Sequence, residues 1–142
     1  LAGAIVTALQ EQENIVPATL DGFESITGKG IKVTYQDAEY WAGSHKLLKD
    51  YHATLTDVLG EMLAQYESDG CSIVYFGRKD ELLAIVAIKD QIKATSAEAV
   101  RELRTQGIEV YMLTGDGERT ASAVAGRLGN IQDIADALPD DK

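Results

Sequence analysis

The sequence has few of the features that disulfide-bonded, nucleic-acid-binding or membrane-spanning proteins need. Its one cysteine, Cys71, rules out both an internal disulfide and a cysteine cluster for zinc. Lysine and arginine number 13 against 23 aspartate and glutamate, a net charge of −10. Because nucleic acids and anionic membranes bind basic faces, this balance argues against both as partners. The longest apolar run, Leu82 to Ile88, is far shorter than the roughly 18 residues of a membrane span, so we expect no direct membrane insertion.

The composition is that of a soluble globular protein, with 45% hydrophobic and 25% charged residues. The 142 residues suffice for one ordinary domain or two small ones. A lone cysteine fits a reducing, cytoplasmic setting. The stretch Leu1–Leu9 has no basic lead-in of a signal peptide and no capping residue, so it is typical of a helix already under way. We therefore expect the chain to begin inside a larger protein.

The first part of the chain has the pattern of antiparallel hairpins and one helix. Residues 31–35 and 39–42 alternate in character and predict a hairpin, and so do residues 71–76 and 82–88. Between the hairpins, one apolar stripe at helical spacing comprises Leu55, Val58, Leu59, Met62, Leu63 and Tyr66. An α+β unit with an antiparallel sheet is the expectation for residues 1–88.

The pattern changes near Lys89 and Asp90, where we place a domain boundary. Thr95 to Glu98 forms a capping-box pattern that predicts the start of a helix ending at Gly107. An apolar strand at 108–113 and a helix at 118–128 follow. Helix, strand and helix at this spacing predict a parallel sheet within residues 89–142.

The strongest chemical signal is the segment from Gly107 to Asp116, in which a strand ends in a hydroxyl, a glycine and a carboxylate. In open α/β sheets, ligands bind outside the carboxyl ends of the strands. There, the Thr114 hydroxyl and the N–H groups of Thr114 and Gly115 are suited to phosphoryl oxygens, aided by the N-terminus of the next helix. The alternative is an ordinary turn in which Thr114 or Asp116 caps the helix.

With its surroundings, this segment resembles the phosphorylation domain of P-type ATPases of the heavy-metal (type IB) branch. The matching stretches are Ile88–Lys93, Ala97–Leu103, Gly107–Asp116, Glu118–Ala121, Ala123–Ala125 and Ala137–Lys142. Earlier in the chain, Phe23–Ile31 and Gly43–Ser44 resemble that branch's nucleotide-binding domain. The resemblance implies an α/β fold in two parts. These are a nucleotide-binding domain at 1–88 without its N-terminal part, and an incomplete Rossmann-like, haloacid-dehalogenase-type phosphorylation domain at 89–142.

The resemblance also implies which residues touch the nucleotide. These are Glu24, Gly28, Gly30, Ile31, Gly43, Ser44 and Asp90. Gly28 and Gly30 correspond to a Gly-x-Gly loop, where backbone approaches a ligand because no Cβ intervenes. Ile31 packs beside the adenine by the same resemblance. Ser44 stands where the family usually has asparagine, and Gly28-Lys-Gly30 by itself is also typical of a hairpin turn.

For the phosphoryl group, the resemblance implies contacts from Thr114 and Gly115, orientation by Asp116, and charge neutralisation by Lys142. It implies ATP and Mg²⁺ as cofactors of the parent pump, and the pump's remaining domains as partners. The parent pump is then an ATP-driven metal translocase, with copper(I) as the expected ion. The expected location is the cytoplasmic side of an integral membrane protein of the bacterial inner membrane.

The sequence departs from the family where phosphoryl transfer takes place. It contains neither the Asp-Lys-Thr-Gly-Thr string of the nucleophile nor the Gly-Asp-Gly-x-x-Asn-Asp string for magnesium, and the family's His-Pro pair is absent too. Transfer needs a nucleophile, a metal and charge clamps together, so we expect the chain alone to bind ATP without turning it over.

Two other classes of protein stay open. One is a soluble haloacid-dehalogenase-type phosphatase, in which Thr114 and Lys142 would play similar roles. The other is a structural role, in which a sheet edge pairs between chains and gel filtration reports an oligomer. Three remaining residue types receive structural interpretations: surface histidines at His45 and His52, a core position for Trp41, and a small buried hydrophobe at Cys71.

Overall fold

The computed structural model describes residues 2–11, 15 and 17–137. The chain divides into two compact units. Unit 1 contains residues 1–55 and 73–88, and unit 2 contains residues 56–72 and 89–142. The division after residue 88 coincides with the boundary placed from the sequence, whereas residues 56–72 group with unit 2. The assignment of a nucleotide-binding and a phosphorylation domain to these segments stays a prediction.

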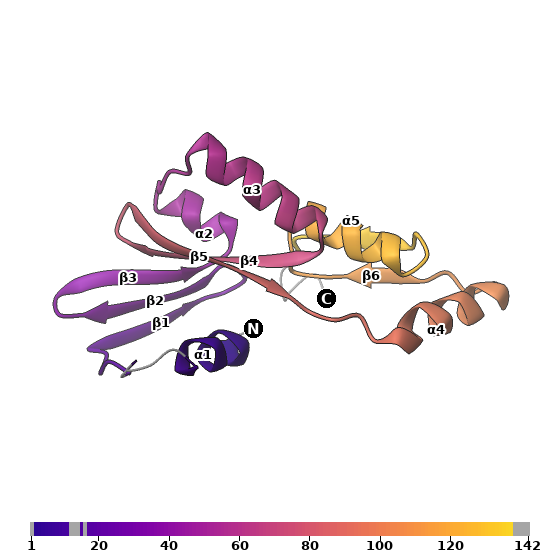
Figure 1. Ribbon diagram of the computed structural model, residues 1–142, viewed down its shortest axis with the longest axis horizontal. Helices are drawn as coiled ribbons and strands as arrows, with labels where there is room; N and C mark the ends of the chain where they lie inside the picture. The colour runs from indigo at the N-terminus through magenta and orange to yellow at the C-terminus, as the bar shows by residue number, and fades with distance from the viewer. Residues whose placement is uncertain (1, 12–14, 16, 138–142) are drawn as a thin grey trace. The chain divides into compact units, whose positions relative to one another are not determined.

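Unit 1 is built on a five-stranded sheet in the order β1-β2-β3-β4-β5, drawn in purple to rose in Figure 1. The strands are β1 (Gly22–Ile26), β2 (Gly30–Tyr35), β3 (Ala38–Gly43), β4 (Cys71–Arg78) and β5 (Glu81–Lys89). The helices are α1 (Ala2–Gln10) and α2 (His45–Asp50), of which α2 packs against β3. The first four strands pair antiparallel, as the alternating segments predict. Sequence analysis missed β1.

Short turns set the register of this sheet. Gln36 and Asp37 both have positive φ, 50° and 59°, and they join β2 to β3 as a two-residue turn. Such turns need left-handed backbone at both positions, because that twist matches the strands they connect. Lys79, with a φ of 51°, begins the corresponding turn between β4 and β5. Both predicted hairpins are therefore confirmed.

Trp41 lies at the centre of unit 1, as its sequence context predicts. Its side chain is 2% exposed, and Leu47 and Leu48 of α2 are 1% and 3% exposed. The indole stacks on Tyr51 with ring centroids 5.2 Å apart, and its Nε1 donates a hydrogen bond to the Lys79 carbonyl at 2.7 Å. The only polar atom of the indole is therefore satisfied, which allows the ring to be buried without a desolvation penalty.

Unit 2 places helices beside a short parallel sheet. Its elements are α3 (Asp57–Ser68), α4 (Ala94–Thr105), β6 (Tyr111–Leu113), α5 (Glu118–Arg127) and β7 (Gln132–Ile134). β6 and β7 pair in parallel, which confirms the predicted type of sheet, and α5 connects them (Figure 1). α5 packs on both α3 and β7. Ala121 and Ala125 of α5 are 1% and 2% exposed, since small side chains let the neighbouring elements approach closely.

One detail of the predicted helices is wrong. The capping box places the start of α4 at Thr95, but the helix begins at Ala94 with Lys93 in the cap position and no side-chain cap. The amphipathic helix predicted around residues 55–66 is confirmed as α3, in which Leu63 is buried, whereas Val58 and Met62 of the apolar stripe are 69% and 50% exposed. The helical spacing of apolar residues shows that one face of a helix is apolar. It does not show how much of that face another element covers.

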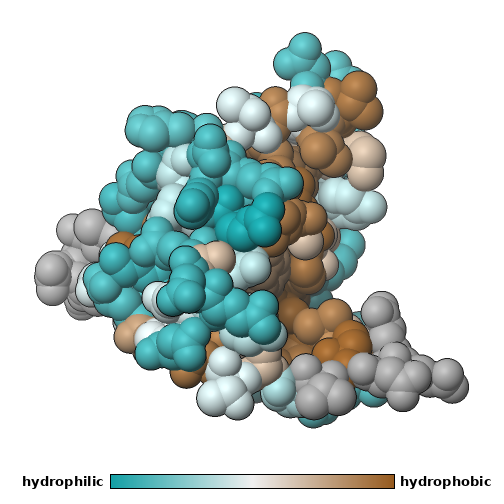
Figure 2. Space-filling view, turned by 90° about the vertical axis from the view of Figure 1, so that its left-hand side faces the viewer, coloured by the Kyte–Doolittle hydropathy of each residue, from teal (hydrophilic) through white to brown (hydrophobic). Residues whose placement is uncertain are grey.

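Apolar side chains remain on the surface of both units, and Figure 2 shows such residues in brown beside a hydrophilic area. In unit 1, Phe23 of β1 is 66% exposed. In unit 2, Tyr111, Leu113 and Ile134 are 52%, 39% and 53% exposed. Leu113 and Ile134 are register partners, and Tyr111 lies two residues from Leu113. The three therefore share one open face of the β6–β7 sheet.

Candidate functional site

The loop after β6 contains three of the predicted site residues, and its backbone is held at both sides. The Thr114 N–H donates to the Ile134 carbonyl at 3.0 Å, and the Ala137 N–H donates to the Thr114 carbonyl at 2.9 Å. The Asp136 N–H donates to the Asp116 carbonyl at 2.8 Å. These bonds tie the loop to the chain after β7, so the end of β6 has one defined conformation.

The side chains of this loop form a closed hydrogen-bond network. The Thr114 hydroxyl donates to Asp116 Oδ2 at 2.9 Å, and the Asp116 N–H donates back to Thr114 Oγ1 at 3.1 Å. Ser72 Oγ, from the start of β4, donates to Asp116 Oδ1 at 2.8 Å. Both carboxylate oxygens of Asp116 therefore accept a hydrogen bond from a hydroxyl group. Sequence reasoning missed Ser72, which lies 44 residues before Asp116 in the chain.

The network decides which groups of the loop are available to an anion. The Thr114 N–H is occupied by Ile134, contrary to its predicted role, whereas the Gly115 N–H has no partner among the described residues. Among the described residues, a Cβ built on Gly115 would meet only the Ala137 carbonyl oxygen, at an ordinary 3.5 Å. Neither Thr114 nor Asp116 caps α5, because its cap position is Gly117, without a side-chain hydrogen bond. No described side chain therefore caps the first N–H groups of α5, as an anion site at this helix end requires.

A second group of predicted residues meets at one corner of the sheet of unit 1. Gly28, with a φ of 68°, lies in the turn between β1 and β2, and Gly30 opens β2 with a φ of 149°. Gly30 is the register partner of Gly43, the last residue of β3. The Ser44 N–H donates to the Lys29 carbonyl at 2.8 Å, which joins the turn to the start of α2. The structure therefore brings together Gly28, Gly30, Gly43 and Ser44.

This corner has no room for larger residues. A Cβ on Gly30 would lie 2.2 Å from the Ala42 carbonyl oxygen, and one on Gly43 would lie 2.2 Å from the Lys29 carbonyl oxygen. Both obstacles are backbone atoms, so they cannot turn away. Lys29 also forms an ion pair with Asp50 at the end of α2, with 2.6 Å between Nζ and Oδ2. Glycine is thus required here by the packing of the chain on itself, whatever else binds there.

Ile31 and Glu24 lie on opposite faces of the sheet. Glu24 pairs in register with Lys32, and its carboxylate lies 3.0 Å from Lys32 Nζ. The hydrogen bond that Lys32 donates to this carboxylate raises the pKa of Lys32 above its ordinary value. Because side chains alternate along a strand, Ile31 faces the other side, where it is 37% exposed. A single flat ligand on one face of the sheet would therefore reach Ile31 and not Glu24.

Ser44 contains a buried polar atom without a partner. Its Oγ is inaccessible to solvent and makes no hydrogen bond with the described residues, although it lies in the cap position of α2. An unsatisfied buried hydroxyl is costly.

The two remaining predicted residues are not part of either group. Asp90 is exposed in the segment between β5 and α4, and it belongs to unit 2, whereas the glycine corner belongs to unit 1. Lys142 lies outside the described residues. Their predicted roles stay predictions.

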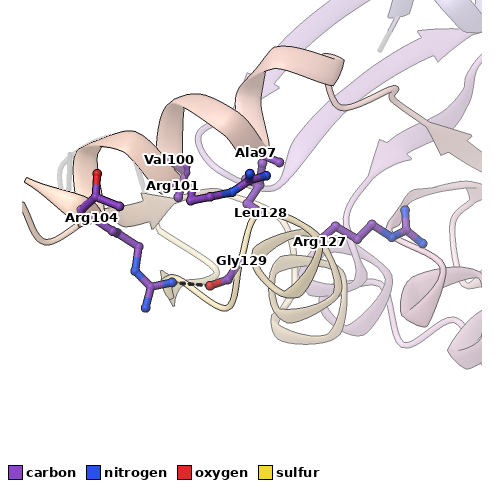
Figure 3. Close-up of a pocket in the computed structure, with 8 residues that line it drawn as sticks. Ala97, Val100, Arg101, Arg104, Arg127, Leu128 and Gly129 are labelled. Atoms are coloured by element: carbon purple, nitrogen blue, oxygen red, sulfur yellow. Dashed lines mark hydrogen bonds between the residues drawn. The ribbon is translucent and has the colours of Figure 1, made fainter.

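A cleft of about 450 Å³ lies between α4 and the end of α5 (Figure 3), and none of Thr114, Gly115 and Asp116 lines it. Arg101, Arg104 and Arg127 are among the residues that line it. Arg104 donates to the Gly129 carbonyl just after α5, and Arg127 donates to the Asp69 carbonyl just after α3, at 2.7 Å. Two of the three guanidinium groups thus satisfy carbonyls at helix ends, which is a structural role.

No metal site is assembled in the part of the chain that the structure describes. No group of three or more His, Cys, Asp or Glu side chains lies close enough to hold an ion there. His45 and His52 are exposed, and Cys71 is buried, as predicted. None of the described helices has the length and hydropathy that crossing a bilayer would require.

Comparison with known sequences identifies relatives along the whole chain. The copper-exporting P-type ATPase of Staphylococcus epidermidis is 36% identical over 143 residues, which cover 100% of this chain and 18% of the relative. The Staphylococcus haemolyticus protein of the same name is 35% identical, with the same coverage. The chain therefore spans about a fifth of the length of these pumps.

Solved structures give the same picture. A zinc-transporting PIB-type ATPase in its E2.Pi state is 31% identical, with a TM-score of 0.54, over 99% of this chain and 22% of that one. The catalytic domain of the CPx-ATPase CopB-B, in a structure concerned with nucleotide binding, has a TM-score of 0.64 at 18% identity. It covers 99% of this chain and 46% of that one, and at this identity it supports the fold alone.

These relatives confirm the resemblance to heavy-metal P-type ATPases and the mixed α/β fold class. The haloacid dehalogenase-like hydrolase family matches residues 3–142, nearly the whole chain. The chain therefore belongs to the haloacid dehalogenase-like hydrolases.

Proposed function

We propose that this chain is part of the ATP-handling cytoplasmic headpiece of a heavy-metal-translocating P-type ATPase, with copper as the exported ion. In this proposal the sheet of unit 1 binds ATP, and the loop after β6 contacts the phosphoryl group that moves to an aspartate of the longer protein. We assign copper as the ion because the curated relatives are copper exporters. One related structure is that of a zinc-transporting ATPase. Binding to the other domains of the pump, and a location at the bacterial inner membrane, follow from the same relatives.

The observation that carries the proposal is the loop from Thr114 to Asp116. It lies at the carboxyl end of a parallel strand, where open α/β sheets bind ligands. Among the described residues, the Gly115 N–H has no partner and the N-terminus of α5 has no side-chain cap, so both offer donors to an anion. Thr114, Gly115 and Asp116 are the residues that we assign to the phosphoryl group, and Lys142 is the lysine that we assign to its charge.

The glycine corner supports nucleotide binding in unit 1. Gly28, Gly30, Gly43 and Ser44 meet there, next to Ile31, whose side chain is 37% exposed. An adenine has a flat apolar face that such a side chain can cover. These residues fit one end of ATP. Glu24 lies on the opposite face and Asp90 in the other unit, so both need a contact beyond this corner to take part.

Magnesium is not accommodated by the described residues alone. Mg²⁺ needs oxygen ligands in near-octahedral geometry, and both oxygens of Asp116 already accept hydrogen bonds from hydroxyl groups. We therefore assign no Mg²⁺ ligand in the part of the chain that the structure describes. Mg²⁺ and the phosphorylation step belong, in this proposal, to the longer protein.

The alternative function is that of a soluble haloacid-dehalogenase-type phosphatase. The family match by itself suits either function. The pump is favoured because the sequence identity to copper exporters extends through unit 1 and covers 100% of the chain.

The test is a titration of the chain with ATP and with ADP, followed by backbone amide NMR. Saturable shifts at Gly28, Gly30, Ile31 and Gly43 are expected. Replacing Ile31 by alanine removes the apolar contact with the adenine, and it should weaken ATP binding about five- to tenfold. Leu83→Ala is the matched control, because Leu83 of β5 is also an exposed apolar side chain of this sheet, at 50%.

The outcomes separate the two functions. Equal weakening by Ile31→Ala and Leu83→Ala, or no saturable shift in the folded chain, contradicts the adenine site. Steady release of p-nitrophenol from p-nitrophenyl phosphate by the same sample, abolished by Thr114→Ala, supports the phosphatase instead.

A further inference from the structure

Ser72 connects the loop from Thr114 to Asp116, called here the phosphoryl loop, to the start of β4. It follows Cys71 at the start of β4 and belongs to unit 2 with the loop itself. Its Oγ donates to Asp116 Oδ1 at 2.8 Å, in a partly buried position. Nothing in the sequence pattern singles out this serine, because the contact spans 44 residues.

The position of Ser72 is set by two further hydrogen bonds to α5. The hydroxyl of Thr120, which is 5% exposed, donates to the Cys71 carbonyl at 2.9 Å. Arg127 donates to the Asp69 carbonyl at 2.7 Å. Residues 69–71 are thus anchored at both ends of α5, and the Ser72 hydroxyl is held in place before any ligand arrives. Preorganised donors of this kind are more effective than mobile ones, because no ordering is needed on binding.

Within residues 2–11, 15 and 17–137, the Asp116 carboxylate accepts hydrogen bonds from two side chains. Asp116 Oδ2 is satisfied by Thr114, and Oδ1 by Ser72. Without the serine hydroxyl, the carboxylate is free to rotate and to present an unsatisfied charged oxygen towards the loop. A bound phosphoryl group would then be repelled more strongly, because the negative charge of Asp116 is no longer dispersed over two hydroxyl donors.

We propose that Ser72 is a positioning residue of the phosphoryl site: it orients Asp116, and through Asp116 it orients the Thr114 hydroxyl. This role rests on the proposed function of the loop. The functional contact, from Ser72 to Asp116, then comes from the start of β4. The later residues of this strand, 73–78, belong to unit 1. Ser72 touches neither the ligand nor the reacting atoms in this proposal.

The test is a titration with inorganic phosphate, read from the amide signals of Thr114 and Gly115. Ser72→Ala should weaken phosphate binding about three- to tenfold, as expected when a charged acceptor loses one hydrogen bond. Ser72→Thr keeps the hydroxyl and should restore the affinity. Ser122→Ala is the matched control and should leave the affinity unchanged, because the one hydrogen bond of the Ser122 hydroxyl to a described residue is an exposed 3.4 Å contact with Asp133.

A double substitution separates positioning from a general loss of structure. If Ser72 acts through Asp116, Ser72→Ala should have no effect on phosphate affinity in a chain that already contains Asp116→Ala. An equal loss in both backgrounds overturns the proposal, and so does an unchanged affinity in the Ser72→Ala chain. Absence of saturable shifts in the unsubstituted chain overturns the phosphoryl assignment of the loop, and the role of Ser72 with it.

Discussion

Replacing Gly77 by alanine is the sharpest test of the core of unit 1. Gly77 of β4 is the register partner of Trp41 of β3, so a side chain there points at the indole. A Cβ on Gly77 would lie 2.2 Å from Trp41 Cζ2 and 2.4 Å from Cε2. Ordinary carbon–carbon contact is about 3.5–4.0 Å, so the ring would have to move by roughly 1.5 Å.

The cost can be worked out from what the displaced ring loses. Moving it breaks the 2.7 Å hydrogen bond from Nε1 to the Lys79 carbonyl and disturbs the stack on Tyr51. The hydrogen bond contributes about 1 kcal/mol, and overpacking a core costs about 1–3 kcal/mol. We therefore expect Gly77→Ala to lower the free energy of unfolding by about 2–4 kcal/mol.

Urea unfolding measures this directly, because Trp41 is the only tryptophan and its emission reports on unit 1. Gly22→Ala is the matched control in the same sheet: a Cβ there would meet the Thr34 side chain at an ordinary 3.5 Å. The control should stay within about 0.5 kcal/mol of the unsubstituted chain. If Gly77→Ala has the same urea midpoint and the same emission maximum as the control, the assigned packing of Trp41 on Gly77 is wrong.

Three further substitutions test single groups. Burial, followed by the 2.9 Å hydrogen bond to Glu39, raises the pKa of Tyr51 to about 12 from 10.0. The neutral phenol therefore stabilises the fold fully below pH 10, and this contribution is lost between pH 10 and about 12. Tyr51→Phe should accordingly be less stable than the parent at pH 8, with a gap in urea midpoint that narrows by pH 11. A constant gap would contradict the raised pKa. Thr120→Val should cost about 1–2 kcal/mol in thermal unfolding followed by circular dichroism, because the buried Cys71 carbonyl loses its donor. Thr120→Ser should recover most of this, and failure to do so would assign the loss to packing. Ser44→Ala removes a buried hydroxyl without a partner among the described residues, so it should stabilise the chain by up to about 1 kcal/mol. A reduced ATP affinity in that variant, measured by the same NMR titration, would keep Ser44 in the nucleotide site, and an unchanged affinity would remove it.

Much of the local structure could be predicted from the sequence, because it depends on neighbours along the chain. The two hairpins follow from alternation between short turns, and α5 follows from its helical spacing before Gly129, whose φ is 101°. β1 was missed because the sequence of Gly22–Ile26 does not alternate between apolar and polar residues. Its pairing with β2 comes from the register of the sheet rather than from its own pattern.

Of the residues predicted to bind the nucleotide, some lie together in the structure and others do not, because their positions depend on how the strands pair. The residues of the Gly-x-Gly corner lie close together in the structure, since a turn and a strand end bring Gly28, Gly30 and Gly43 to one place. Glu24 was assigned to the same group, but the parity of the strand puts it on the other face from Ile31. Glu24 and Ile31 lie on different strands, so the sequence alone does not show that they face opposite sides. The register between β1 and β2 has to be known first.

By itself, the sequence predicted the two antiparallel hairpins, the parallel type of the second sheet, and the Thr114-Gly-Asp116 motif at the end of β6. Periodicity, turn chemistry and the Thr114-Gly-Asp116 motif depend only on residues that are close together in the sequence, so they can be recognised without the fold. Only the tertiary structure shows that Ser72 donates a hydrogen bond to Asp116, and that no side chain fits at Gly77 against the Trp41 ring. These contacts join residues tens of positions apart, and they exist because packing closes the chain on itself, which no local pattern encodes.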